Sequence, residues 1–210
     1  MYLEKQPLNS EEAQKVSNSI HLINHLQEAG KLFGNRIVIS GGYATDGALG
    51  EITRPHSDID IQIYGRNGNA EEAVRNLFIH LSEDNLFYAD LVLQDKGRKD
   101  FYHNFLIEKG WLGADIYYLH VDNDPFDENK VIVKSDGTLS EPHPYSRLTG
   151  TLEGVRFGIQ EPLTEIVDKI YKREFRGDEK KEKHEQDIHN LETITDKNEV
   201  KQKLDELTTV

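Results

Sequence analysis

The sequence predicts an α/β fold, in which helices flank a sheet and a small helical C-terminal segment follows. Three observations support this prediction. Apolar residues recur at helical spacing near both ends of the chain, short apolar or alternating runs typical of strands fill the middle, and glycines and capping residues separate the two. The 210 residues, 36% of them hydrophobic, are enough for one domain of ordinary size. We expect a core with an N-terminal helix over residues 1–160 and the helical segment over 161–210.

The first elements are a helix, a buried strand and a short second helix. Asn9 and Glu12 have the spacing of a capping box, and the apolar stripe after them predicts a helix that ends near Gly30. A short apolar run at residues 36–40, bounded by glycines, predicts a buried strand. The glycine pair that follows it should turn the chain into a short helix through Leu49.

The next strand carries the first chemically informative pattern. Residues 57–64 alternate three isoleucines with polar residues, among them Asp58 and Asp60. The isoleucine face is expected in the core, which leaves both carboxylates on the opposite face. Carboxylates at i and i+2 of one strand repel each other, and a shared divalent cation would relieve that repulsion.

The middle of the chain is expected to supply a further helix and most of the sheet. Asn69 and Glu72 have capping-box spacing, which predicts a helix through residue 81. Runs rich in aromatic and β-branched residues then predict strands at 87–93, 101–107, 112–121 and 130–133, the last closed by the turn signal Asp136-Gly137.

The pattern becomes helical again from Pro162. Proline suits the first turn of a helix, and apolar residues at helical spacing follow it. The charged residues 178–185 are expected to form a solvated loop and helix face. A helix through Leu191 and a last one through Leu207 complete the prediction.

Composition limits the partners and the compartment. The net charge of −13 argues against a surface that binds nucleic acid and suits a cationic or neutral substrate, although the same charge also serves solubility. The absence of cysteine excludes disulfides and thiolate metal sites. The first residues lack the basic and apolar regions of a signal peptide, and the chain has no run that could span a bilayer. We therefore expect a cytoplasmic protein without a membrane partner.

The glycine pair and the acidic pair belong to a longer series with fixed spacing: Ser40-Gly41-Gly42, Asp46, Gly50, Thr53-Arg54, His56, Asp58 and Asp60. This series resembles the signature of the polymerase-beta-like nucleotidyltransferases. The match is closest to their antibiotic-modifying branch, the lincosamide nucleotidyltransferases and the aminoglycoside 2″-adenylyltransferases. The resemblance implies a nucleotidyltransferase-type mixed sheet flanked by helices.

Weaker similarity extends downstream. Residues 113–116 resemble the family's later strand with a third carboxylate, here Asp115. Residues 152–154, together with Pro162-Leu163 and Lys169, resemble the passage into its C-terminal helices. The chain departs from the family pattern at Tyr43, where relatives usually carry Trp, and in a longer segment between residues 64 and 115.

The resemblance implies an enzyme, a Mg²⁺-dependent nucleotidyltransferase, with the roles of its residues set by that chemistry. It would move a nucleoside monophosphate, AMP from ATP or its counterpart from another nucleoside triphosphate, to a hydroxyl of a small molecule such as an aminoglycoside or lincosamide antibiotic. Two Mg²⁺ ions are expected on Asp58, Asp60 and Asp115, with Asp115 also the general base. The residues expected to contact the nucleotide are Ser40, Gly41, Gly42, Arg54, His56 and Lys169.

Several alternatives remain open at this stage. His56 either touches phosphate or orders its loop, and Asp46 either holds the Thr53-Arg54 loop or contacts the ligand. His184 and Asp187 are candidates for purely structural roles. The function itself has two alternatives: a nucleotide-binding, antitoxin-like or regulatory protein that acts on or through a protein partner, and an enzyme that modifies a protein hydroxyl. The sequence does not fix the oligomeric state.

Overall fold

The computed structural model describes residues 8–65, 76, 88–92, 101–108, 110–123, 130–135, 138–144, 148–175 and 181–208, and the side chains of residues 8–65, 76, 148–174 and 183–208. The helices are α1 (Ser10–Leu32), α2 (Gly41–Leu49), α4 (Pro162–Phe175), α5 (Lys181–Leu191) and α6 (Lys197–Thr208). The strands are β1 (Arg36–Ser40), β2 (Asp58–Gly65), β3 (Tyr88–Val92), β4 (Phe101–Glu108), β5 (Gly110–Asn123), β6 (Lys130–Ser135), β7 (Thr138–Pro144), β8 (Thr149–Leu152) and β9 (Val155–Gly158).

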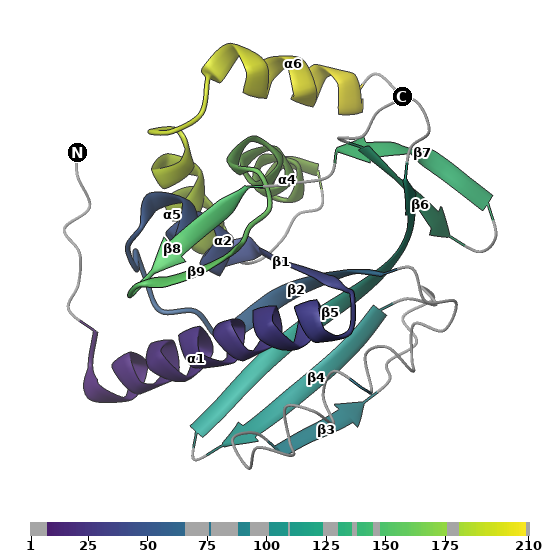
Figure 1. The fold of residues 1–210 in the computed structure, drawn as a ribbon. Helices are drawn as coiled ribbons and strands as arrows, with labels where there is room; N and C mark the ends of the chain where they lie inside the picture. The colour runs from purple at the N-terminus through teal and green to yellow at the C-terminus, as the bar shows by residue number, and fades with distance from the viewer. Residues whose placement is uncertain are drawn as a thin grey trace.

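A mixed sheet forms the centre of the described part, with α1 across it and the C-terminal helices beyond its β1 side (Figure 1). Its strands follow the order β1-β2-β5-β4-β3, and β6 and β7 continue from β5. The pair β2–β5 is parallel, whereas β1–β2, β4–β5 and β3–β4 are antiparallel. The predicted α/β fold with a mixed sheet is therefore confirmed.

The first helix begins as predicted but ends later. Asn9 Oδ1 accepts a hydrogen bond from the Glu12 N–H at 2.9 Å and Glu12 Oε2 accepts one from the Asn9 N–H at 2.9 Å, so the capping box is present. Gly30 does not end the helix, which continues to Leu32. A Cβ on Gly30 would lie 2.6 Å from Ile37 Cγ1. This glycine therefore serves close packing of α1 on β1.

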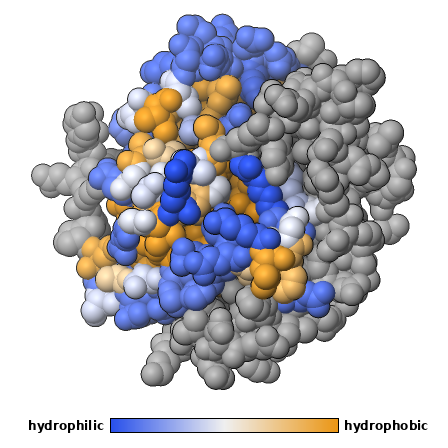
Figure 2. Space-filling view, in the orientation of Figure 1, coloured by the Kyte–Doolittle hydropathy of each residue, from blue (hydrophilic) through white to orange (hydrophobic). Residues whose placement is uncertain are grey.

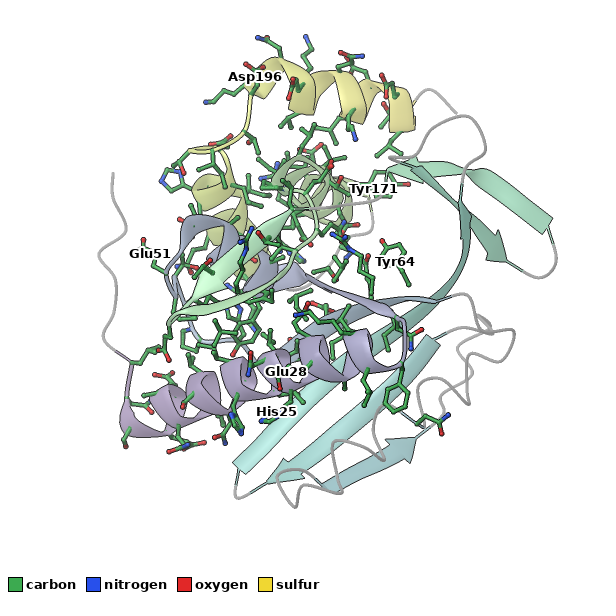
Figure 3. All side chains as sticks on the ribbon, viewed as in Figure 1. His25, Glu28, Glu51, Tyr64, Tyr171 and Asp196 are labelled. Atoms are coloured by element: carbon green, nitrogen blue, oxygen red, sulfur yellow. The ribbon has the colours of Figure 1, made fainter. Side chains whose placement is uncertain are left out.

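The isoleucine face of β2 lies in the main core, as predicted. Ile59, Ile61 and Ile63 are at most 1% exposed. They pack with the apolar stripe of α1 and with the hairpin β8–β9. The opposite face of α1 is polar, and Figure 3 shows Glu28 on this exposed side. One layer of helix thus covers one face of the β1–β2 part of the sheet, and the acidic face of β2 is directed away from that core.

The hairpin β8–β9 and the strand β7 were not predicted. Residues 152–154 were interpreted from sequence as part of the passage into the C-terminal helices, but Leu152 ends β8 and Glu153-Gly154 form the two-residue turn of this hairpin. Glu153 and Gly154 both adopt left-handed backbone conformations, with φ of 46° and 82°. Two consecutive residues with positive φ are what a tight two-residue hairpin requires. The hairpin is short, with four residues in each strand, which explains why its alternation was too brief to recognise.

The C-terminal helices form where the sequence predicts them. Pro162 is the first residue of α4, and α4, α5 and α6 share a small second core of Ile166, Val167, Ile188, Leu191 and Val200. The outer surface of α6 is strongly hydrophilic (Figure 2). The division of the chain at residue 160 stays a prediction. The helix predicted at 69–81, except residue 76, and the turn at 136–137 lie outside the described residues.

Within the described part, no helix combines the length and the apolar character that crossing a membrane requires.

Candidate active site

Three neighbouring strands align the predicted catalytic positions. In the antiparallel pair β1–β2, Ser40 lies opposite Asp60, and in the parallel pair β2–β5, Asp60 lies beside Asp115. Adjacent strands are about 4.8 Å apart and paired residues share a face of the sheet. The three positions therefore form one row across the sheet, which we call the acidic row. Asp58 extends it along β2, because alternate residues of a strand share a face.

The oxygen chemistry of the acidic row fits a divalent cation. Asp58 and Asp60 are both partly exposed on one face of β2, and carboxylate oxygens are the ligands that Mg²⁺ prefers. Ser57 Oγ donates a hydrogen bond to Asp58 Oδ1 at 3.1 Å. Among the side chains that the structure describes, no three metal-binding groups cluster. Asp115, the expected third ligand, is placed by its backbone alone.

The glycine pair is required by contacts within the site itself. Gly41 has φ of 70°, and a Cβ there would lie 2.0 Å from Asp60 Oδ2. A Cβ on Gly42 would lie 2.1 Å from His56 Nδ1. Any side chain at either position would displace a residue of the predicted signature. Besides the freedom that glycine gives a turn, the pair lets β2 and the loop before it approach the start of α2.

Asp46 and His56 form a buried pair that fixes the loop between α2 and β2. Asp46 Oδ1 accepts hydrogen bonds from the Thr53 N–H at 3.1 Å and from Thr53 Oγ1 at 2.6 Å. Asp46 Oδ2 lies 2.6 Å from His56 Nε2. Asp46 is 0% and His56 6% exposed, and the His56 ring packs 4.6 Å from the ring of Tyr43. Of the two roles considered from sequence, Asp46 and His56 therefore show the loop-ordering one in this structure.

Arg54 is held by a residue far away in the sequence. Its Nε and Nη2 donate to the two carboxylate oxygens of Asp187, at 3.0 and 2.8 Å, and Lys169 Nζ donates to the same carboxylate at 2.9 Å. Although burial acts to raise it, the hydrogen bond from Arg54 and the charge of Lys169 together lower the pKa of Asp187. Two predicted nucleotide-binding cations thus share one buried carboxylate of α5.

Glu165 completes this chain of contacts and was missed by the sequence analysis. Its Oε1 accepts a hydrogen bond from the Gly41 N–H at 2.8 Å, and its Oε2 lies 3.9 Å from Lys169 Nζ. The residue is 3% exposed, and burial raises its pKa to about 7, against the opposing influence of Lys169 and the Gly41 N–H. A glutamate in the first turn of a helix normally faces solvent. Only its position three residues after Pro162, one helical turn before Lys169, could have drawn attention to it.

The structure brings together most of the predicted site residues, within or beside the acidic row. Ser40 is the N-cap of α2 and makes no side-chain capping hydrogen bond. The N–H of Gly41, expected to hold phosphate, donates to Glu165 instead. Lys169 is 5% exposed and faces Asp187. We name the buried chain that links Gly41 to Arg54 through Glu165, Lys169 and Asp187 the ionic relay.

Comparison with known proteins identifies the fold. A family model described as aminoglycoside-2''-adenylyltransferase matches residues 22–86, which include the glycine pair and the acidic pair. The solution structure of ANT(2'')-Ia, in a study of its substrate-regulated conformation dynamics, superposes with a TM-score of 0.62 and 18% identity, over 92% of this chain and 92% of that chain. This is the nucleotidyltransferase fold.

Two crystal structures agree with this assignment. ANT(2")-Ia in complex with adenylyl-2"-tobramycin gives a TM-score of 0.57 and 17% identity, over 87% of this chain and 92% of that chain. The lincomycin-bound lincosamide antibiotic adenylyltransferase LnuA gives 0.53 and 16%, over 90% of this chain and 100% of that chain. No curated protein matches the chain significantly. The predicted resemblance to antibiotic-modifying nucleotidyltransferases is confirmed by the family model and by the nucleotidyltransferase fold.

Proposed function

We propose that this protein is an adenylyltransferase that moves AMP from ATP to a hydroxyl of a small antibiotic of the aminoglycoside or lincosamide type. The observation that carries the proposal is the acidic row, in which Ser40, Asp60 and Asp115 align on three adjacent strands. The row lies next to a helix start that a glycine pair brings against Asp60. Metal-binding carboxylates beside backbone N–H groups are the parts that phosphoryl transfer requires.

In this proposal Asp58, Asp60 and Asp115 would hold two Mg²⁺ ions, which would supply positive charge to stabilise the triphosphate during transfer. Asp115 also accepts the proton of the attacking hydroxyl. Its register position beside Asp60 supports this role, because a base must lie within hydrogen-bonding reach of the hydroxyl it activates.

The start of α2 and the cations near it would receive the triphosphate. Ser40, Gly41 and Gly42 offer the N-terminal end of a helix, where anions bind favourably. Arg54, His56 and Lys169 are proposed to add positive charge or hydrogen-bond donors on the nucleotide side. In the present structure each of the three is tied to a carboxylate, Asp187 or Asp46.

The proposed acceptor is a cationic small molecule. The chain has 38 acidic and 25 basic residues, and its net charge of −13 favours association with a polycation such as an aminoglycoside. The neighbours in complex with adenylyl-2"-tobramycin and with lincomycin support a drug-sized acceptor.

The experiment that tests the proposal is a transfer assay. The protein is incubated with Mg²⁺ and ATP labelled at the α-phosphate, in turn with tobramycin, with lincomycin and without an acceptor. We expect label on at least one antibiotic with the wild type and none with Asp58→Asn. Glu192→Gln, which removes an exposed carboxylate from the turn after α5, should transfer label as the wild type does.

The proposal is wrong if no antibiotic is labelled and Asp58→Asn binds ATP as the wild type does. Label that appears on the protein itself would favour an enzyme that modifies a protein hydroxyl.

A further inference from the structure

The Gly41 N–H can donate one hydrogen bond, and two acceptors compete for it: the Glu165 carboxylate and, in the proposed function, a phosphate oxygen. In this structure Glu165 Oε1 takes the hydrogen bond at 2.8 Å. In the proposed function a phosphate oxygen takes the same N–H, because Gly41 is the first residue of α2 and N–H groups at that end have no partner within the helix. Two anionic oxygens on one N–H would lie in contact and repel each other. The carboxylate and the phosphate therefore exclude each other.

Glu165 reaches the Gly41 N–H from a distant part of the chain. The side chain comes from α4, whereas the N–H it binds belongs to α2, 124 residues earlier. It lies next to the acidic row, since Gly41 itself is in contact with the Asp60 carboxylate. A further anion beside these carboxylates adds repulsion.

A second partner for the carboxylate already lies close by. Lys169 is one turn further along α4, and its Nζ is 3.9 Å from Glu165 Oε2. That is too long for a hydrogen bond but short enough that a rotation of the Glu165 side chain would close it. Lys169 at present donates to Asp187, which also holds Arg54. If Glu165 left Gly41 and paired with Lys169, the hydrogen bond from Lys169 to Asp187 would weaken. Because Asp187 also holds Arg54, the position of the Arg54 loop would then change.

We propose that Glu165 acts as an internal substitute for phosphate: its carboxylate occupies the triphosphate position on the Gly41 N–H, must leave when nucleotide binds, and thereby sets the affinity for the nucleotide. This inference rests on the proposed function. Glu165 is a positioning residue in this account, because its effect on the nucleotide is exerted through Gly41 and Lys169.

The test measures binding instead of catalysis. Calorimetric titrations at pH 8, above the pKa of about 7 of Glu165, compare the wild type with Glu165→Gln, Glu165→Asp and Asp168→Asn. The probes are inorganic tripolyphosphate and a nonhydrolysable ATP analogue, with and without Mg²⁺. Gln keeps the size of the side chain and removes its charge. Asp keeps the charge and is one methylene too short to reach Gly41. Asp168→Asn is the matched control. It removes a carboxylate from the same helix, but this carboxylate pairs with Lys172 and not with Gly41.

We expect both Glu165 variants to bind the triphosphate probes more tightly than the wild type, by about tenfold if the Glu165-bound state makes up about nine tenths of the free protein. Asp168→Asn should change affinity less than about twofold, because its partly exposed charge is screened. Unchanged or weaker binding by both Glu165 variants would overturn the inference. Tighter binding by Glu165→Gln alone would also overturn it, because loss of charge repulsion would then suffice as the explanation.

The inference and the proposed function fail in different ways. If the wild type binds the probes and the Glu165 variants bind no more tightly, Glu165 does not compete with phosphate and the proposed function stands. If none of the four proteins binds either probe, both are wrong.

Discussion

The two halves of the candidate site are built in contrasting ways. The β1–α2–β2 half holds its residues within a span of 21 positions, from Ser40 to Asp60, and positions them by glycine contacts and strand register. The half contributed by α4 and α5 holds Glu165, Lys169 and Asp187 more than 100 positions later, and links them to the first half by buried ionic hydrogen bonds.

Because of this difference, we expect the first half to carry the catalytic chemistry and the second half to stabilise the fold. The carboxylates of β2 are partly exposed, so solvent screens their charges and they contribute little to folding stability. The carboxylate of Asp187 is buried and paired with two cations, so its removal leaves charges without compensation. Substitutions in the first half should therefore reduce activity, whereas substitutions in the second should reduce stability.

The largest effect is expected for Asp60→Asn. Loss of a metal-binding carboxylate should lower the rate of AMP transfer at least about a thousandfold, equivalent to several kcal/mol of lost transition-state stabilisation. The free energy of unfolding should change by less than about 1 kcal/mol, because the Asp60 side chain is partly exposed and its charge is screened. Transfer kinetics and chemical denaturation of the same sample measure both. If Asp60→Asn unfolded more easily and kept its transfer rate, the first half of the site would serve stability and not catalysis.

Asp187→Ala should show the opposite pattern. It leaves the buried Lys169 and the largely covered Arg54, whose side chain is 13% exposed, without their shared partner, which should lower the free energy of unfolding by about 3–5 kcal/mol. Asp168→Ala, which breaks a partly exposed pair with Lys172 on α4, should cost only about 0–1 kcal/mol. Urea denaturation of the two variants tests the contrast, and equal costs would show that the ionic relay contributes no more than a surface pair.

The pH dependence of stability should report Glu165. Its folded-state pKa is raised to about 7 from 4.5, so folding favours its protonated form. The contribution to stability is complete below the unfolded pKa and is lost as pH rises through 7, up to about 3 kcal/mol. In Glu165→Gln this loss should disappear. Denaturation curves of the nucleotide-free proteins at pH 5 and pH 8 compare the two, and parallel pH profiles would refute the assignment.

The smallest effect is expected for alanine substitutions that distinguish two reasons for glycine at position 41: its left-handed backbone and its close approach to Asp60. Gly34 and Gly41 have nearly the same φ, 69° and 70°, but a Cβ on Gly34 meets nothing within 4 Å, whereas one on Gly41 would meet Asp60. Each alanine variant should lose about 1 kcal/mol to the left-handed backbone, and Gly41→Ala about 1–2 kcal/mol more to the contact. Thermal denaturation that ranks the two variants equally would show that Asp60 moves aside without cost.

The contrast between the halves also decides what sequence could predict. The capping box at Asn9, the isoleucine face of β2 and the helix start at Pro162 are local patterns, and all three are confirmed. The series of residues from Ser40 to Asp60, which carries the resemblance to antibiotic-modifying nucleotidyltransferases, likewise lies within the residues that the family model matches. Each of these depends on residues close together in the chain, whose geometry the backbone fixes.

The parts that sequence did not predict depend on tertiary contacts. Glu165 resembles an ordinary first-turn glutamate until α4 packs on α2, and the partnership of Arg54 with Asp187 spans 133 positions. Gly30 resembled a helix end because its packing role against Ile37 needs the neighbouring strand. The β8–β9 hairpin escaped notice because two four-residue strands carry little periodicity.

The most direct test of the central claim is the rate of AMP transfer in Asp115→Asn compared with Asp122→Asn. Both residues belong to β5, but Asp115 pairs with Asp60 and Asp122 pairs with Ile132 of β6. If the acidic row is the catalytic centre, Asp115→Asn loses at least about a thousandfold in rate, and Asp122→Asn transfers AMP as the wild type does. Equal rates in the two variants would contradict the account.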